Sequence, residues 1–269
     1  MQSDFPCVSQ NQLKKWSRLA EVKFRREDGL FLAEGAKVVE ELLKSDWQVE
    51  AVLVLPDKIS HWERLVAQAP ETLPVYQLKN QEWKKLSQDK EPEGIIAIVK
   101  NRQKTTLSSW LQSAGGHLLI GHEISNPRNL GALMRSARWF GFTKMMLSAD
   151  SVDVTHPKVI RASMGSIFHL SILTDVDLQT ALREIKLDFF LIGSDVKHGV
   201  APHLPGKEAA LLVGNESHGL PEDLLALTDE RWRVPGDGKA DSLSLPQAAA
   251  IMMYEMTKEG ARNKDKGGR

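Results

Sequence analysis

Short runs of apolar residues alternate along the chain with longer stretches in which apolar positions recur every three or four residues. Runs of the first kind are typical of buried strands, and the longer pattern is typical of amphipathic helices. In the N-terminal part the predicted strands are "FLAEG" (31–35), "VEAVLVLP" (49–56), "LPVYQL" (73–78) and "EGIIAIVK" (93–100), and helical patterns cover 9–28 and 35–44. The alternation predicts an α/β unit that ends near residue 102.

The alternation restarts after a polar stretch, "RQKTTLSSWLQSAGG", which contains a glycine pair and is the best candidate for a linker. Beyond it, strands are predicted at 117–124, 144–148, 189–195, 209–215 and 231–235, with helices at 129–140, 177–187 and 244–259. These strands are almost continuously apolar, which indicates a mainly parallel sheet covered by helices on both faces. The expected organisation is a domain over 1–103, a linker over 104–116, a second domain over 117–260 and a basic tail over 261–269.

Composition narrows the class of protein. A chain of 269 residues is long enough for two domains, and no apolar run approaches the ~20 residues that cross a membrane. The N-terminus has no apolar core of the kind found in secretory signals, so we expect a cytoplasmic protein that does not enter membranes. The single cysteine, Cys7, excludes an internal disulfide framework, and the scattered histidines predict no metal site.

Charge is balanced overall but clustered locally. A net charge of zero counts mildly against a protein that binds through phosphate contacts. Six basic residues nevertheless fall within one short segment: Lys14, Lys15, Arg18, Lys23, Arg25 and Arg26. Two interpretations stay open at this point, a solvated helix face or a surface that follows nucleic-acid phosphates.

Polar residues gather in three loops that follow predicted strands, where the ligand crevice of a parallel sheet lies. The first is "SNPRNLGALMRSAR" (125–138), in which we expect a helix to begin near Asn129, with Asn129 as its cap. Arg135 follows Leu133 and Met134 in this helix. We interpret it as a buried guanidinium that requires an anion, either a protein carboxylate or a phosphate from a ligand.

The second loop is "LLVGNESHGL" (211–220), where Gly214 would let a ligand approach the backbone and Glu216 offers a carboxylate. The third is "VPGDGKADSLSLPQAAAIMMYEM" (234–256), where Ser244 and Gln247 have the spacing of a capping box. No glycine-rich phosphate loop, zinc-protease motif or nucleophile elbow is present, which counts against nicotinamide, ATP and zinc chemistry.

In order and in register with the strands, "NPRNLGALMRSARWFG", "LLVGNESHGL" and "DSLSLPQAAAIMMYE" resemble the three motifs of the SpoU branch of the SPOUT RNA methyltransferases. The resemblance covers roughly residues 12 to 258 and includes "KFRREDGLFLAEGAKVVEELL", which is similar to the substrate-binding domain of this branch, a small fold like that of a ribosomal RNA-binding protein. It implies transfer of a methyl group from S-adenosylmethionine to a ribose 2′-hydroxyl of rRNA or tRNA. It also implies a C-terminal domain threaded into a deep trefoil knot through which two copies form a homodimer.

The resemblance also implies residue roles. Substrate or catalytic roles fall on Asn129, Arg135, Glu216 and Ser242, and cofactor contacts on Ser194, Gly214, Val234, Leu243 and Ser244. RNA contacts are expected from the basic segment and Arg128, with Arg135 gripping the phosphate beside the target ribose and Glu216 holding either Arg135 or Asn129.

One position departs from the motif, because Ser244 places a hydroxyl where the family commonly has an asparagine amide, and Pro246 follows. A non-catalytic RNA-binding protein of the same architecture is therefore the alternative. A nucleotide-binding α/β enzyme that acts on a small molecule is a weaker one.

Overall fold

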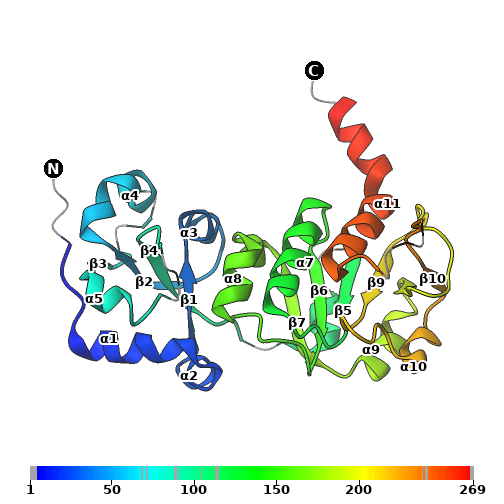
Figure 1. Ribbon diagram of the computed structural model, residues 1–269, viewed down its shortest axis with the longest axis horizontal. Coiled ribbons are helices and arrows are strands. Elements are labelled where there is room, and N and C mark those ends of the chain that lie inside the picture. Colours follow the sequence, from blue (N-terminus) through cyan, green and yellow to red (C-terminus); the bar gives the residue numbers. More distant parts are fainter. Residues whose placement is uncertain are drawn as a thin grey trace. The chain divides into compact units, whose positions relative to one another are not determined.

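The chain forms two compact units (Figure 1). The computed structural model describes residues 5–67, 69–70, 72–87, 89, 91–103, 105–112, 115–237, 239 and 242–266, and over 259–266 the backbone alone. Unit 1 comprises Met1–Gln103 and Asp153–Phe168, and unit 2 comprises Lys104–Val152 and His169–Arg269. A boundary falls at the predicted end of the first domain, but the grouping of residues 153–168 with unit 1 was not predicted.

Unit 1 is built on a four-stranded mixed sheet of order β1-β4-β2-β3. β4 (Ile95–Lys100) lies antiparallel between β1 (Leu30–Glu34) and β2 (Val49–Val54), and β3 (Val75–Gln77) runs parallel to β2. Its helices are α1 (Gln10–Ser17), α2 (Val22–Asp28), α3 (Ala36–Leu43), α4 (Ile59–Val66), α5 (Asn80–Trp83) and α8 (Pro157–Ser163).

The single helix predicted over 9–28 is two helices separated by a short 3-10 turn. Ser9 caps α1 through a capping box with Gln12, and the turn covers Arg18–Ala20. Glu21 then adopts an extended conformation, with φ −95° and ψ 134°, so the helix cannot continue through it. The apolar periodicity runs across this break, which is why the pattern did not reveal it.

Both faces of the unit 1 sheet are covered. Buried side chains of α1, the 3-10 turn and α5 pack on one face, with Leu13, Trp16, Leu19 and Trp83 in that core. The segment from the C-terminal half covers β1: α8 contacts β1 and α3, and Phe168 stacks on Phe31 with ring centroids 6.5 Å apart. Unit 1 therefore completes its core with residues that come more than fifty positions after its own last strand.

Unit 2 is a six-stranded sheet in which every pairing is parallel, of order β10-β8-β9-β5-β6-β7. The strands are β5 (Leu118–Gly121), β6 (Lys144–Ser148), β7 (Ser171–Val176), β8 (Phe190–Ser194), β9 (Ala209–Val213) and β10 (Glu230–Trp232). The predicted parallel α/β sheet is thus confirmed, although β7 was not among the predicted strands.

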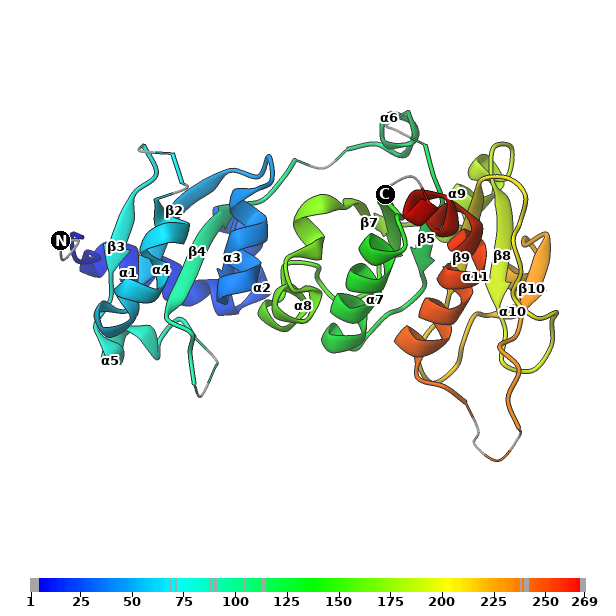
Figure 2. The ribbon, with the colours of Figure 1, turned by 90° about the horizontal axis from the view of Figure 1, so that it is seen from above.

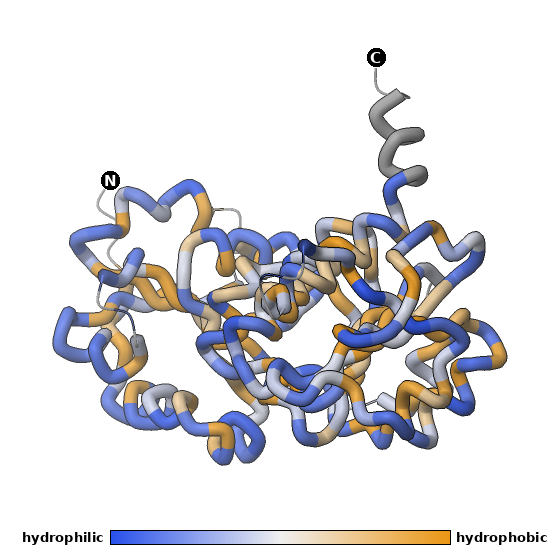
Figure 3. Tube along the Cα trace, turned by 45° about the vertical axis from the view of Figure 1, so that its right-hand side comes forward, coloured by the Kyte–Doolittle hydropathy of each residue, from blue (hydrophilic) through white to orange (hydrophobic). Residues whose placement is uncertain are grey.

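Helices cover both faces of this sheet, as Figure 2 shows, with α7 (Pro127–Trp139) and α11 (Leu245–Lys266) on one face. On the other lie α6 (Leu107–Leu111), α9 (Leu178–Ile185) and α10 (Glu222–Leu225). Colouring by hydropathy in Figure 3 shows short hydrophobic stretches separated by hydrophilic ones in both units.

The expected linker over 104–116 is wrong for its described part. α6 lies within it, and Trp110 is 3% exposed in the core of unit 2, packed with Leu182 and Leu173. One buried tryptophan in an otherwise polar stretch gives no periodic signal. Among the described residues, no helix is long and apolar enough to span a bilayer, and no group of three acidic, histidine or cysteine side chains is arranged to hold a metal ion.

Candidate active site

The strand order of unit 2 reverses at β5. The chain runs from β5 outward to β6 and β7, then crosses to the other side of β5 to build β8, β9 and β10. In parallel α/β sheets the ligand crevice lies beyond the carboxyl ends of the strands at such a switch point. The loops after β5 and β9 flank this point, and they contain the first two predicted motifs.

The loop after β5 leads into α7 two residues earlier than predicted. Asn126 caps the helix, because its Oδ1 accepts from the backbone N–H of Arg128 at 2.9 Å, and Pro127 is the first helical residue. Proline is favourable there because it lacks an N–H that would stay unpaired. The predicted cap at Asn129 is therefore wrong, and this leaves the Asn129 side chain available for another contact.

Glu216, in the loop after β9, joins that loop to the start of α7. Its Oε1 accepts from Asn129 Nδ2 at 3.0 Å and from the backbone N–H of Asn126 at 3.3 Å, and its Oε2 accepts from Ser125 Oγ at 3.3 Å. The carboxylate thus bridges the two loops across the switch point. Of the two partners expected for Glu216, the structure pairs it with Asn129 and not with Arg135.

A glycine is needed at position 214 for a reason other than the predicted approach of a ligand to the backbone. A Cβ at this position would lie 2.2 Å from Gly219 C, 2.3 Å from Gly219 O and 2.4 Å from Leu220 N, all backbone atoms. Asn215 and Gly219 exchange backbone hydrogen bonds of 2.9 and 3.1 Å, which folds the loop back onto Gly214. The missing side chain makes room for the loop's own backbone, and the loop in turn presents Glu216.

Arg135 is exposed, so the prediction of a buried guanidinium is wrong. Arg128, Arg135 and Trp139 follow one another at spacings of seven and four, which places them on one exposed face of α7, while Leu133 and Met134 point into the core. No described residue forms an ion pair or hydrogen bond with the Arg135 side chain. Its charge is available to an external anion.

The other predicted site residues lie at the same edge of the sheet. Ser194 is the last residue of β8, Val234 comes two residues after β10, and Ser242, Leu243 and Ser244 directly precede α11. The carbonyl of Ser244 accepts from the N–H groups of Gln247 and Ala248, which starts the helix through the backbone. The side chain of Leu243 is 46% exposed.

Two further residues at this edge escaped prediction. Glu123 has a left-handed φ of 51°, held because its N–H donates to Ser148 Oγ at 2.8 Å and its carbonyl accepts from Asn215 Nδ2 at 3.0 Å. The neighbouring His122 has a buried Nδ1 with no hydrogen-bond partner in the described structure. The available signal was a polar His-Glu pair directly after an apolar strand.

The basic segment divides into exposed and buried members. Lys14, Lys15, Lys23 and Arg26 are exposed, and Arg18 is half-buried, with its guanidinium carbon 3.9 Å from the centre of the Phe24 ring. Arg25 is 1% exposed and hydrogen-bonds within unit 1, so its expected contact with RNA is wrong. The helix period explains the split, because α2 turns Arg25 inward and Lys23 and Arg26 outward.

The fold is similar to those of two solved structures. A putative RNA methyltransferase of the TrmH family from Porphyromonas gingivalis has 25% identity and a TM-score of 0.80, covering 94% of this chain and 99% of that one. An AdoMet-bound rRNA methyltransferase from Sinorhizobium meliloti has the same fold, with 24% identity, a TM-score of 0.78, and coverage of 94% and 97%.

Family membership follows from the sequence comparisons. Residues 116–254 match the SpoU rRNA Methylase family, and residues 10–97 match the MRM3-like substrate binding domain. The chain belongs to the SpoU rRNA methylase family. It is 30% identical over 91% of its length, and 95% of the relative's, to the 23S rRNA (guanosine(2553)-2′-O)-methyltransferase RlmP of Bacillus subtilis.

Proposed function

We propose that this chain transfers a methyl group from S-adenosylmethionine to a ribose 2′-hydroxyl of ribosomal RNA in the cytoplasm. The family and the name of the Bacillus subtilis relative support this reaction. The observation that carries it is the Glu216 bridge, because it assembles two family motifs at the switch point where a parallel sheet binds its ligand.

The test is to map ribose methylation in rRNA from cells with and without the protein, and to titrate the purified protein with S-adenosylmethionine. One 2′-O-methyl group should disappear from the rRNA, and the cofactor should bind. Absence of cofactor binding would instead favour the non-catalytic RNA-binding protein.

The residues present fit the cofactor. Ser194, Gly214, Val234, Leu243 and Ser244 lie at or beyond the carboxyl ends of adjacent strands, and this set supplies hydroxyls, backbone groups and the exposed apolar surface of Leu243. The unpartnered Nδ1 of His122 at the same edge is a further polar group that no described residue satisfies. S-adenosylmethionine supplies an electrophilic methyl group, so the protein needs no nucleophile of its own.

The chain's own task is to position the RNA and stabilise charge. A ribose hydroxyl is a weak nucleophile, and alignment can contribute about 7–11 kcal/mol, against about 3–5 kcal/mol from proton removal by a general base. Arg135 cannot act as that base, because a guanidinium stays protonated in proteins. We assign it to the phosphate beside the target ribose, where it also stabilises the negative charge that develops on the attacking oxygen.

The hydrogen bond between Asn129 and Glu216 holds the start of α7 in place, so we expect its loss to lower the rate of methylation. Glu216→Ala removes three hydrogen bonds worth about 0.5–1.5 kcal/mol each and should lower the methylation rate about 10- to 100-fold. Glu216→Gln keeps an acceptor for Asn129 and should retain most of the rate. Equal losses in the two variants, measured in single-turnover assays, would contradict this role.

The exposed basic residues of unit 1 form the proposed RNA-contacting surface, defined here as Lys14, Lys23 and Arg26. Each phosphate contact adds to the salt dependence of binding, so Arg26→Ala or Lys14→Ala should weaken RNA binding and reduce the slope of log K against log salt by about 1. Filter binding at several salt concentrations measures this slope. An unchanged slope in both variants would remove this surface from the RNA site.

We further propose a homodimer through unit 2 and a knotted chain path in that unit, as the family resemblance implies. The exposed apolar side chains Trp139, Ile251 and Tyr254 on the packed pair α7 and α11 support the dimer, with Trp139 83% exposed. Trp139→Glu should convert a dimer into a monomer in sedimentation experiments, because a charge would be buried in the interface. A wild-type monomer would contradict the proposal.

A further inference from the structure

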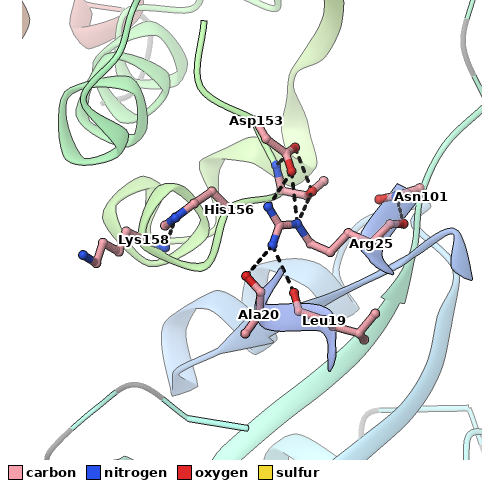
Figure 4. Close-up of polar contacts among 8 residues, drawn as sticks. Leu19, Ala20, Arg25, Asn101, Asp153, His156 and Lys158 are labelled. Atoms are coloured by element: carbon pink, nitrogen blue, oxygen red, sulfur yellow. Dashed lines mark hydrogen bonds and ion pairs between the residues drawn. The ribbon is translucent and has the colours of Figure 1, made fainter. Parts of the chain in front are cut away.

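Arg25 is the one buried arginine among the described residues, and each of its three guanidinium nitrogens donates at least one hydrogen bond. Its Nη2 lies 2.6 Å from Asp153 Oδ2, its Nε donates to Asp153 Oδ2 and Thr155 Oγ1 at 3.1 Å, and its Nη1 donates to the carbonyls of Leu19 and Ala20 at 3.0 and 2.9 Å. Figure 4 shows the guanidinium between the Asp153 carboxylate on one side and these two carbonyls on the other.

The break in the N-terminal helix creates half of this site. In a continuing helix the carbonyls of Leu19 and Ala20 would accept from amides four residues later. Because the helix stops at Glu21, both carbonyls are free to accept from Arg25, which lies in the next helix. The local geometry of α1 and α2 is thus adapted to hold one guanidinium inward.

Both carboxylate oxygens of Asp153 accept hydrogen bonds. Its Oδ1 accepts from the Thr155 N–H at 2.9 Å and from Thr155 Oγ1 at 2.8 Å, while Oδ2 faces Arg25. Burial pushes the pKa of Asp153 up, but the hydrogen bonds from Thr155 and Arg25 outweigh it and lower the pKa below its usual value. Asp153 therefore stays charged at neutral pH, and the pair persists until the solution is acidified through that lowered pKa.

The chain position of Asp153 connects this pair to the active-site loop. Val152 directly precedes it, and the Val152 N–H donates to the Ile124 carbonyl at 2.8 Å, while the Ile124 N–H donates to Ser151 Oγ at 3.2 Å. The next two residues, Ser125 and Asn126, are the ones that Glu216 binds. Fixing Asp153 therefore also restrains Ser151 and Val152, the two residues before it, which hydrogen-bond to Ile124 in the loop after β5.

We propose that Arg25 and Asp153 form a positioning link that couples helix α2, which contains Lys23 and Arg26 of the RNA-contacting surface, to residues 124–129, the end of the loop after β5 and the start of α7. Neither side chain touches RNA or cofactor. Lys23 and Arg26 on α2 bind the RNA phosphates. Arg25, in the same helix, holds Asp153, and the hydrogen bond from Val152 to Ile124 then fixes the position of the loop after β5. The link rests on the proposed methyltransferase activity, and a misplacement of about 1 Å at a reacting group can cost about 10²-fold in rate.

The test compares four single variants and one double variant of the full chain: Arg25→Met, Arg25→Lys, Asp153→Asn, Arg64→Met, and Arg25→Met with Asp153→Asn. Single-turnover methylation at saturating RNA and cofactor should fall about 10- to 100-fold in Arg25→Met and Asp153→Asn, and no further in the double variant. The dissociation constant for S-adenosylmethionine and the salt slope of RNA binding should stay unchanged. Arg25→Lys should not rescue, since an ammonium cannot reach four acceptors in the fork geometry of a guanidinium.

Arg64→Met is the matched control, because it makes the same change at an exposed arginine of α4 that lies outside the RNA-contacting surface. It should leave both the saturating rate and the salt slope near their wild-type values. An unchanged rate in Asp153→Asn, or a reduced salt slope in Arg25→Met, would overturn the link.

Hydrogen exchange supplies a readout that does not depend on activity. The amides of Ile124, Asn126 and Val152 should exchange faster in Asp153→Asn than in the wild type. Faster exchange confined to unit 1 would show a merely structural ion pair and overturn the proposal. A wild-type protein that methylates no rRNA would instead defeat the proposed function, and the exchange experiment would still decide the link.

Discussion

Arg135→Ala is expected to lower the rate of methyl transfer about 10²- to 10³-fold, with little change in stability. Removing one group that stabilises developing negative charge typically costs about 2.7–4 kcal/mol in the transition state. Because the side chain is exposed and makes no bond to a described residue, its loss leaves no unpaired partner inside the protein. Single-turnover rates with purified protein and rRNA, together with a thermal melt, measure both effects.

Two companion variants sharpen this result. Arg135→Lys keeps the charge but loses the two parallel N–H groups that fit a phosphate, so its rate should lie between those of wild type and Arg135→Ala. Arg138→Ala removes another exposed arginine of α7. Arg138 is not assigned to the phosphate, so the rate of this variant should stay within about twofold of the wild-type rate. If Arg135→Lys and Arg135→Ala both methylate like the wild type, Arg135 has no role in the reaction.

Gly214→Ala should destabilise unit 2 by about 3 kcal/mol and abolish methylation with it. The added methyl group would meet three backbone atoms of Gly219 and Leu220, and backbone cannot rotate aside as a side chain can. The loop must open, which moves Glu216 away from Asn129. Thermal unfolding should shift by about 2–4 °C for each kcal/mol lost in a domain of this size.

Gly236→Ala provides the comparison for stability. Nothing lies within 4 Å of a Cβ built at Gly236, so the melting temperature should be unchanged or slightly raised. A Gly214→Ala protein that melts at the wild-type temperature would show that the loop can yield, and the role of Gly214 would then lie elsewhere.

The parallel sheet of unit 2 could be predicted because strands buried on both faces carry their signal in consecutive apolar residues. The elements that were not predicted lack such runs of consecutive apolar residues. β7 reads Ser171 to Val176 and is only partly buried at the sheet edge, and α6 depends on the single buried Trp110. Periodicity also passes through Glu21 unchanged, so it could not show where one helix becomes two.

The residue roles at the candidate site stay predictions, and the structure corrects part of their expected geometry. Motif order placed Asn129, Arg135 and Glu216 in three roles, but only coordinates show that Glu216 selects Asn129 and that Arg135 faces outward. Arg25 and Arg26 are adjacent identical residues, and charge counting treats them alike. The direction of each side chain depends on the helix register that follows the break at Glu21.

The excursion of residues 153–168 through unit 1 has a consequence for synthesis. The ribosome synthesises the chain from its N-terminus. The face of β1 that contains Phe31 therefore stays uncovered until Phe168 has been made. A nascent chain released after residue 103 would leave Phe31 open to water and Arg25 without its carboxylate. We expect such a fragment to aggregate, because the apolar face of β1 stays uncovered until residues 153–168 have been made.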